Sequence, residues 1–420
     1  MAAERITIDL AMSAARIEHD IETLSGPAYT GSDDAIRRYA YIPEYRNTLD
    51  YFTRELKAAG FDVSLDPVGN LIARNRPKGE PAFGVGSHCD SNRNGGRYDG
   101  TLGVVTALEI CRISTELGLN LPLQLISFLE EESSGFGQGV LGSRIMTQQV
   151  TDEDLRENFR ALDDGRSFWD HATEAGLEPA RWRECAEGLD GLVGWIELHI
   201  EQGRVLQDER QQVGIVTAIV GITWVDLTFH GRADHAGGTP MGYRADAGLA
   251  AAETVVELEK LANAQSIPTV GTAGVGEFQP GLHNVIPGEA RLGLDIRSID
   301  ESVYRAVVAD IVAFTEQAAE ARKLTLDVEM QDLTQATGMD EGVVGALEEA
   351  AAASGHPFRL MSSGGGHDTQ HVAPHVPSAM VFVPCKDGIS HSPDELANPA
   401  DAAAAAEIML NAIARLTATA

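Results

Sequence analysis

Residues 82–117, AFGVGSHCDSNRNGGRYDGTLGVVTALEICRISTEL, decide the fold of this chain. The stretch opens on a run of apolar and small residues, 82–88, which is typical of a strand buried on both faces of a sheet. A turn rich in glycine follows, and residues 102–117 carry the apolar pattern of a helix. A buried strand that leads through a turn into a helix is the building unit of α/β proteins.

The same alternation of apolar runs and helical patterns continues on both sides of this stretch. Helical patterns lie at about 44–59 and after the alanine-rich segment 400–406. The other runs that we predict to be strands are VGNLIAR (68–74), LPLQLISFL (121–129), GLVGWIELHI (191–200) and SAMVFVP (378–384). Near-continuous apolar strands between helices predict an α/β domain with a doubly wound mixed sheet.

The middle third of the chain has a different order of elements, β-α-β-β-α-β, which is that of the ferredoxin-like split motif. The segments are strand 215–230, helix 243–264, strands 269–278 and 289–297, helix 301–321 and strand 324–330. A length of 420 residues already favours two domains. We therefore predict an inserted domain at 214–330 and a discontinuous main domain made of 1–213 and 331–420.

Composition excludes several classes of partner. The formal net charge is −31, from 32 basic and 63 acidic side chains. This sign argues against binding to nucleic acid, whose phosphates need Lys and Arg, and against binding to an anionic membrane surface. The charge itself indicates no more than solubility.

Redox and targeting signals are also missing from the sequence. No CxxC pair occurs among Cys89, Cys111, Cys185 and Cys385, so neither a thiolate zinc knuckle nor a redox motif is indicated. The first 24 residues are charged and amphipathic rather than continuously apolar like a signal peptide. No run reaches the length of a membrane-spanning helix, and we expect a cytoplasmic protein.

Metal-ligand residue types stand where four of the predicted strands end, and open α/β sheets bind ligands at such ends. Taken singly, a histidine is more often a packing residue, and three glutamates are usually a solvated helix start. Together, imidazoles and carboxylates without thiolates suit two ions of Zn²⁺, Mn²⁺, Co²⁺ or Ni²⁺ that share a carboxylate. The residues concerned are His88, Asp90, Asp99, Glu130, Glu131, Glu132, His199 and His391.

At this point the sequence resembles a known family, the amidase/hydantoinase-carbamoylase branch of the M20 metallopeptidase clan. The resemblance covers nearly the whole chain, and the ELHIEQG and HAGGTPM blocks and the short spacing from His88 to Asp99 are typical of this branch. The branch includes N-carbamoyl-L-amino acid hydrolases, allantoate amidohydrolases and some β-ureidopropionases. The blocks that carry it are GSHCDSNRNGGRYDGTLGV, FLEEESSGF, ELHIEQGRVL, GRADHAGGTPM, HNVIPGEARLGLDIR, SGGGHD and GISHSPDE, in family order.

The resemblance implies a binuclear metal centre. His88 and His199 would hold one divalent ion, Glu132 and His391 would hold the other, and Asp99 would bridge the two. The family aromatics align with Phe128 and Phe136, and this register makes Glu131 the base and Glu132 the ligand.

Three further residues are implied to act in catalysis. Glu131 would be the general base for a metal-activated water, and Asp90 would orient His88 through its other ring nitrogen. His235 would polarise the scissile carbonyl oxygen across a dimer interface. From the residues alone, His235 is equally well a loop histidine that caps the helix predicted from 243.

The resemblance implies substrate contacts in both domains, and the inserted domain would also serve as a dimerisation and lid domain. Arg297 suits bidentate capture of a carboxylate, although a lone arginine is more commonly part of a surface salt bridge. Gln202 and Asn284 are expected to contact the carboxylate or the ureido group. Gly364 and Gly365 would let backbone N–H groups approach the substrate, unless they form an ordinary turn.

The chain departs from the branch pattern at several positions. The segment EESSGF replaces the usual EEGxRF, so that Ser133 stands for a glycine and Gly135 for an arginine. Cys89 and Gly238 are also unusual, and His367 receives no role. The expected metal ligands are all present, but the missing arginine makes the transfer of any single substrate name unsafe.

We therefore expect a homodimeric metal-dependent amidohydrolase that cleaves the C–N bond of an N-carbamoyl (ureido) L-amino acid. Its substrate would be a small molecule that bears a carboxylate. An allantoate or ureidoglycolate-type amidohydrolase is the nearest alternative, and an N-acyl-amino acid hydrolase is more distant. A non-catalytic binding protein on the same scaffold is the remote alternative. Such proteins usually lose a metal ligand or the base, whereas this chain keeps both.

Overall fold

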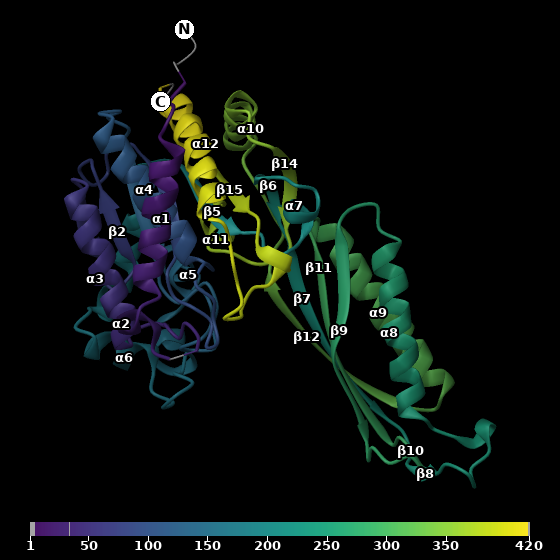
Figure 1. Ribbon diagram of the computed structural model, residues 1–420. Helices are drawn as coiled ribbons and strands as arrows, with labels where there is room; N and C mark the ends of the chain where they lie inside the picture. The colour runs from purple at the N-terminus through teal and green to yellow at the C-terminus, as the bar shows by residue number, and fades with distance from the viewer. Residues whose placement is uncertain (1–4, 33, 419–420) are drawn as a thin grey trace. The chain divides into compact units, whose positions relative to one another are not determined.

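The computed structural model describes residues 5–32 and 34–418, which form two compact units (Figure 1). The second unit consists of Ala218–Gly338 and the short segment Ser362–Gly366, and the first contains the rest. The domain limits drawn from the sequence, 214 and 330, lie a few residues earlier. The difference arises because β6 begins in the large sheet of the first unit and β12 continues to Thr334.

Among the described residues, the large sheet contains nine strands, and the first unit contains ten α-helices. The strands are β1 (Asp62–Leu65), β2 (Leu71–Arg74), β3 (Ala82–His88), β4 (Leu123–Phe128), β5 (Leu192–Ile200), β6 (Val213–Ile219), β13 (Thr337–Gly338), β14 (Phe358–Ser363) and β15 (Ser378–Val383). The helices are α1 (Leu10–Leu24), α2 (Pro27–Thr30), α3 (Pro43–Ala58), α4 (Thr101–Glu116), α5 (Leu141–Met146), α6 (Phe168–Glu174), α7 (Val205–Asp208), α10 (Glu341–Ser354), α11 (Thr369–Val372) and α12 (Pro399–Thr417).

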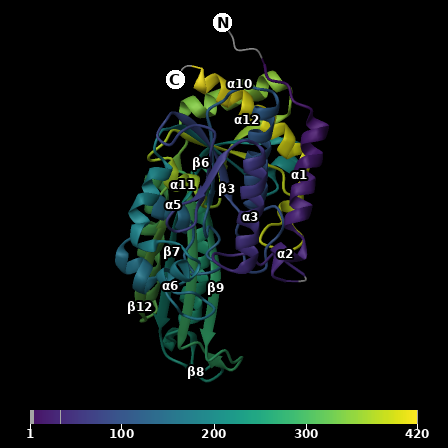
Figure 2. The ribbon, with the colours of Figure 1, turned by 90° about the vertical axis from the view of Figure 1, so that its left-hand side faces the viewer.

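The large sheet is mixed, with strand order β1-β2-β4-β3-β5-β15-β6-β13 and β14 paired to β6. Its centre is parallel, because β3 pairs parallel with β4 and β5, and β5 pairs parallel with β15. Helices α1 and α3 lie on one side of this sheet, and α5 and α11 lie on the other (Figure 2). The predicted doubly wound mixed sheet is therefore confirmed.

The stretch 82–117 forms the strand–turn–helix unit that its pattern predicts. All seven residues of β3 are buried, as expected of a central parallel strand. Helix α4 is also buried over most of its length and contacts β3 and β5. A side chain at Gly103 would overlap the carbonyl oxygen of Leu198, so glycine allows α4 to pack closely against β5.

The C-terminal helix α12 packs into the core through a run of alanines. Ala402–Ala406 are fully buried, and the helix packs against α1, α4 and α10 and against β5 and β15. Small side chains let α12 approach these neighbours closely, which leaves no space for a larger residue.

The second unit is a four-stranded antiparallel sheet of order β12-β7-β11-β9 with two helices packed on it. Its elements are β7 (Gly221–His230), β8 (Asp234–His235), α8 (Ala247–Asn263), β9 (Thr269–Gln279), β10 (Val285–Ile286), β11 (Glu289–Ser298), α9 (Glu301–Ala321) and β12 (Thr325–Thr334). The βαββαβ order that the sequence predicts is present. Inward residues of β7 and β11 form a buried core with α8 and α9, and they include Val225, Leu227, Phe229, Leu292, Leu294 and Ile296.

One predicted strand is wrong in extent. The pattern at 215–230 indicates a single strand, but β6 ends at Ile219 and β7 begins at Gly221. The two strands belong to different sheets. The apolar pattern does not reveal the division, because both halves are apolar enough to be buried in their own sheets.

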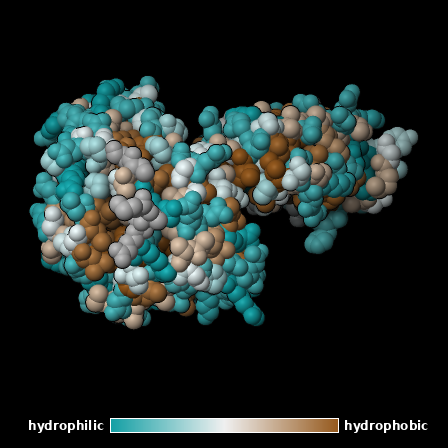
Figure 3. Space-filling view, turned by 90° about the horizontal axis from the view of Figure 1, so that it is seen from above, coloured by the Kyte–Doolittle hydropathy of each residue, from teal (hydrophilic) through white to brown (hydrophobic). Residues whose placement is uncertain are grey.

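Hydrophilic side chains cover much of the face that Figure 3 presents. Among the described helices, none combines the length and the apolar composition needed to cross a membrane. The four cysteines are buried as free thiols.

The packing of α12 generates a stability prediction. Ala404→Leu adds volume where no space exists, and we expect it to lower the free energy of unfolding by about 1–3 kcal/mol. The measurement is urea unfolding followed by circular dichroism. Ala352→Leu is the control, because Ala352 is exposed on α10, and its effect should stay within about 0.5 kcal/mol. Equal stability of both variants would contradict the close packing of α12.

Candidate metal centre

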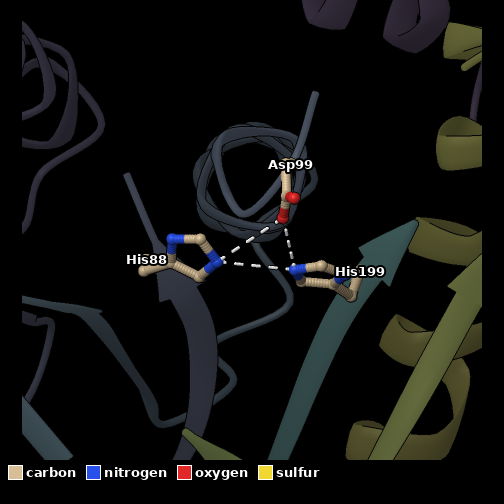
Figure 4. Close-up of side chains that lie close together, drawn as sticks. All are labelled: His88, Asp99 and His199. Atoms are coloured by element: carbon tan, nitrogen blue, oxygen red, sulfur yellow. Dashed lines mark hydrogen bonds and ion pairs between the residues drawn. The ribbon is translucent and has the colours of Figure 1, made fainter. Parts of the chain in front are cut away.

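Three ligand-type side chains from separate elements meet in the first unit (Figure 4). His88 ends β3, His199 lies near the end of the neighbouring strand β5, and Asp99 stands directly before α4. Asp99 Oδ1 lies 3.0 Å from His199 Nε2 and 3.7 Å from His88 Nε2, and the two Nε2 atoms are 3.4 Å apart. All three residues are buried. One atom from each could bind the same ion.

A second group shares Asp99 with the first. His391 Nε2 lies 3.2 Å from Asp99 Oδ2 and 3.4 Å from Glu132 Oε2. The ligand atoms within each group all lie within 4.8 Å of one another. Asp99 therefore presents one oxygen to each group, which is the arrangement of a bridging carboxylate.

The turn before α4 brings His88 to Asp99 because it contains Gly100. Gly100 has a positive φ of 58°, which is unfavourable for residues with a side chain. A Cβ at this position would also overlap the imidazole ring of His88. Glycine is thus required twice, for the backbone conformation and for the ring that packs against it.

Asp90 connects His88 with the glutamates that follow β4. Its two oxygens accept hydrogen bonds from the backbone N–H groups of Glu131, at 3.1 Å, and Glu132, at 3.0 Å. Asp90 Oδ1 also lies 3.4 Å from His88 Nδ1. Asp90 is fully buried and holds the ends of β3 and β4 together behind the ligand atoms.

The three consecutive glutamates have different environments. Glu130 is fully buried away from the ligand groups, and its carboxylate accepts the N–H groups of Ala40, Gly135 and Phe136. Glu132 belongs to the second ligand group, and Glu131 Oε2 lies 3.8 Å from His88 Nε2. A side chain at position 135 would crowd the Glu130 carboxylate, so Gly135 accommodates the buried Glu130.

The pKa values of the carboxylates at the centre are shifted because the carboxylates are buried close together. Burial raises the pKa values of Glu131 and Glu132 well above their usual range, and the negative charges of Glu132 beside Glu131 and of Asp99 beside Glu132 add to this effect. Burial alone would also raise the pKa of Asp99, but the imidazoles of His199, His391 and His88 hold it well below its usual range. Within the described residues, neither Glu131 nor Glu132 pairs with Lys or Arg.

These residues fit divalent metal ions. Imidazole nitrogens and carboxylate oxygens are ligands of Zn²⁺, Mn²⁺, Co²⁺ and Ni²⁺. Glu132 Oε1 and His88 Nδ1 are buried and make no hydrogen bond within the described residues. Several buried carboxylates without Lys or Arg beside them are costly unless a further cation compensates their charge.

Gln202 lies at this centre as well. Its Nε2 donates to Asp99 Oδ2 at 2.9 Å and to Ser390 Oγ at 3.1 Å. Sequence analysis predicts Gln202 as a substrate contact, and the structure places its amide on the shared carboxylate. Both Gln202 and His391 have positive φ values, a conformation that is rare for non-glycine residues and concentrates at functional sites.

Sequence reasoning missed Arg38, which is buried behind the centre. Its Nε donates to the Cys89 carbonyl at 2.7 Å, and its Nη2 donates to Thr101 Oγ1 at 2.7 Å. Arg38 thereby ties the end of β3 to the first residue of α4. Nothing near Arg38 in the sequence indicates this contact, because Cys89 and Thr101 lie more than fifty residues away.

His235 and Asn284 belong to the second unit and lie side by side there. His235 is in β8, which pairs with β10, and the Ala236 N–H donates to the Asn284 carbonyl at 3.0 Å. His235 Nδ1 accepts the N–H groups of Gly237 and Gly238, at 3.1 and 3.0 Å. This acceptor role assigns the proton of a neutral ring to Nε2, and the side chain is exposed.

Arg297 and Gly364 are also brought together in the second unit. Asp295 holds the guanidinium through bonds of 2.7 Å to Nε and 2.8 Å to Nη2, and Nη1 donates to the Gly364 carbonyl at 2.8 Å. Asp295 thus orients Arg297, and these three bonds leave one N–H of Nη1 and one of Nη2 for another acceptor. The N–H of Gly365 donates to Ser363 Oγ at 3.2 Å, so this predicted backbone donor already has a partner.

His367, to which the sequence assigns no role, is buried next to a ligand residue. Its ring centroid lies 4.6 Å from that of His199 in an edge-on arrangement. Burial lowers the pKa of His367 well below its usual value, which favours a neutral ring. Cys89 is buried, and burial raises the pKa of its thiol, which disfavours the reactive thiolate form.

Comparison with known proteins identifies the family. The description "Peptidase family M20/M25/M40" matches residues 84–415. An N-carbamoyl-L-amino-acid amidohydrolase of Paenarthrobacter aurescens is 36% identical over 407 residues, which cover 96% of this chain and 98% of the relative. A ureidoglycolate hydrolase of Oryza sativa subsp. japonica is 34% identical over 394 residues, which cover 91% of this chain and 81% of the relative.

A solved structure extends the likeness to the fold. A hydantoinase/carbamoylase family amidase from Burkholderia multivorans matches with a TM-score of 0.89 and 30% identity, over 98% of each chain. The family resemblance that the sequence blocks indicate is therefore confirmed. The chain belongs to peptidase family M20/M25/M40, is similar to its hydantoinase/carbamoylase amidases, and is a hydrolase.

Proposed function

We propose that this protein hydrolyses an N-carbamoyl L-amino acid to the free amino acid, carbon dioxide and ammonia. The observation that carries the proposal is Asp99, whose two oxygens face His88 and His199 on one side and Glu132 and His391 on the other. The chain is also 36% identical to each of two relatives that are named N-carbamoyl-L-amino-acid amidohydrolases. The similarity to those relatives supports a ureido substrate.

Two divalent ions would be held at this centre. His88, His199 and Asp99 would hold one ion, and Asp99, Glu132 and His391 would hold the other. When bound, such ions supply Lewis acidity, which lowers the pKa of a water molecule and polarises a carbonyl group. The overlapping ligand preferences of Zn²⁺, Mn²⁺, Co²⁺ and Ni²⁺ leave the choice of metal to experiment.

Glu131 is the residue that we assign to proton transfer. Its carboxylate lies beside His88, and burial raises its pKa, which makes it a stronger base than an exposed glutamate. In the proposed reaction, Glu131 takes a proton from the attacking water and passes it to the leaving nitrogen as the C–N bond breaks. Asp90 fixes the backbone of Glu131 by accepting a hydrogen bond from the Glu131 N–H.

The second unit supplies the proposed substrate contacts. Arg297 would bind the substrate carboxylate through the N–H groups of Nη1 and Nη2 that Asp295 and Gly364 do not use, because Asp295 already orients the guanidinium. His235 would donate from Nε2 to the carbonyl oxygen that gains charge during the attack. Asn284 and the backbone at Gly364 are adjacent to these two residues and would complete the contacts.

Hydrolysis of a ureidoglycolate-type compound is the second candidate. The relative from Oryza sativa named ureidoglycolate hydrolase is nearly as similar to this chain as the carbamoylase from Paenarthrobacter aurescens. Both substrate classes combine a ureido group with a carboxylate, so the same centre and the same arginine would serve either.

A substrate panel tests the reaction class. We expect the protein loaded with Mn²⁺ or Zn²⁺ to release ammonia from at least one N-carbamoyl-L-amino acid, and EDTA to abolish this release by removing the metal. The panel includes allantoate, ureidoglycolate and N-acetyl-amino acids. Acid release from N-acetyl compounds alone would move the protein to the acyl-amino acid hydrolases, and inactivity on every compound would favour a non-catalytic protein.

A single substitution tests the base. Glu131→Gln keeps the size of the side chain but cannot accept the proton, so we expect kcat to fall by roughly 10²- to 10⁴-fold while both metal ions remain bound. The measurements are steady-state kinetics and metal analysis of the purified variant. Glu184→Gln makes the same chemical change on an exposed glutamate and should leave kcat unchanged. Full activity of Glu131→Gln would refute the assignment.

Complementation tests whether a homodimer shares its sites. If His235 acts on the site of the partner copy, co-expressed His235→Ala and Glu131→Gln chains form mixed dimers with one intact site. Random pairing then restores about a quarter of wild-type activity, although each variant alone is inactive. The measurement is ammonia release from the mixed preparation. Activity no higher than that of the two separate variants would contradict action across the interface.

A further inference from the structure

A buried carboxylate outside both ligand groups contacts the shared ligand. Glu395 lies four residues after His391 and is buried. Its Oε1 accepts the backbone N–H groups of Tyr98 and Asp99, each at 2.8 Å. The residue thus fixes the backbone of Asp99 itself, at the point where the turn enters α4.

The other oxygen of Glu395 reaches the same carboxylate by a second route. Ser390 Oγ lies 3.0 Å from Glu395 Oε2 and 3.1 Å from Asp99 Oδ2, and it accepts a hydrogen bond from Gln202. One hydroxyl hydrogen serves the two carboxylates, so Ser390 links them through a single shared donor. Glu395 is therefore connected to Asp99 through both the main chain and a side chain.

Gly96 makes space for the side chain of Glu395. A Cβ added to Gly96 would overlap the side chain of Glu395, whereas its φ is not in the left-handed region. Glycine at position 96 is thus explained by space for Glu395 and not by backbone conformation. This contact joins residues 96–99 to residues 390–395, which carry Asp99 and His391.

We propose that Glu395 is a positioning residue that holds the Asp99 carboxylate between the two metal sites. The inference rests on the proposed function, because it assigns a role toward the metal ions of that site. Without Glu395, two buried N–H groups lose their acceptor, and the turn that carries Asp99 loses its attachment to the loop of His391. Because both sites share Asp99, both should then bind metal more weakly.

The first experiment measures metal binding directly. Apo protein is titrated with Zn²⁺ in competition with a chromophoric chelator, and the number of ions and their dissociation constants are compared among variants. We expect Glu395→Ala to weaken Zn²⁺ binding by roughly 10- to 100-fold, as is typical when a residue that supports a ligand is lost. Glu395→Gln retains an oxygen that can accept both N–H groups, and we expect it to restore most of the affinity.

A matched control separates positioning from general stability. Asp66 is also a buried carboxylate that accepts backbone N–H groups, from Val68, Gly69 and Asn70, but it lies outside both ligand groups. Asp66→Ala should lower the Tm of the apo protein and leave the Zn²⁺ affinity unchanged. Ser390→Ala, at a partly exposed position, tests the side-chain route if Glu395→Ala does not fold.

A double substitution tests the contact from the opposite side. Gly96→Ala should displace Glu395 and weaken Zn²⁺ binding to a similar extent. Added to Glu395→Ala, however, it should cost little more, because the side chain that it displaces is already absent. Additive losses would overturn the assigned contact.

The outcomes distinguish the two proposals. Wild-type protein that binds no Zn²⁺ or hydrolyses no ureido compound would refute the proposed function. Wild-type protein that binds two ions and turns over substrate, together with unchanged Zn²⁺ affinity in Glu395→Ala and Ser390→Ala, would overturn the positioning role alone.

Discussion

The carboxylate of Asp99 is the interaction on which the rest of the site depends. Its oxygens face imidazoles from three parts of the chain, and those imidazoles keep it ionised despite its burial. Such an arrangement is stable only if the backbone on each side is fixed, because buried charges that lose a partner are costly. The surrounding structure supplies this support. Gly100 and Glu395 fix the turn that carries Asp99. Arg38 fixes the end of β3, and Asp90 fixes the backbone that follows β4.

The architecture explains why these residues meet. Parallel strands place their carboxyl ends at one edge of the sheet, so β3 and β5 deliver His88 and His199 side by side. Helix α4 begins close to that edge because Gly103 allows tight packing on β5, and Asp99 precedes its first turn. The candidate metal centre therefore lies within the first unit, whereas Arg297, Asn284 and His235 belong to the second.

The sequence predicts the parts of this arrangement that depend on local pattern. Buried strands, the βαββαβ insert and the ligand types at strand ends follow from apolar runs and from motifs such as ELHIEQG. The role of Glu395 could not be predicted, because its partners are backbone groups nearly three hundred residues earlier. The role of Arg38 could not be predicted from local pattern either. The division of 215–230 into two strands depends on tertiary packing rather than on a turn signal.

The central claim is that two metal ions share Asp99, and electron paramagnetic resonance of the Mn²⁺-loaded protein tests it most directly. Ions joined by one carboxylate lie about 3.5–4 Å apart, close enough for their spins to couple. The account predicts that two equivalents of Mn²⁺ give the spectrum of a coupled pair, and that Asp99→Asn abolishes the coupling. A spectrum of isolated Mn²⁺ ions at two bound equivalents, or saturation at one equivalent, would contradict it.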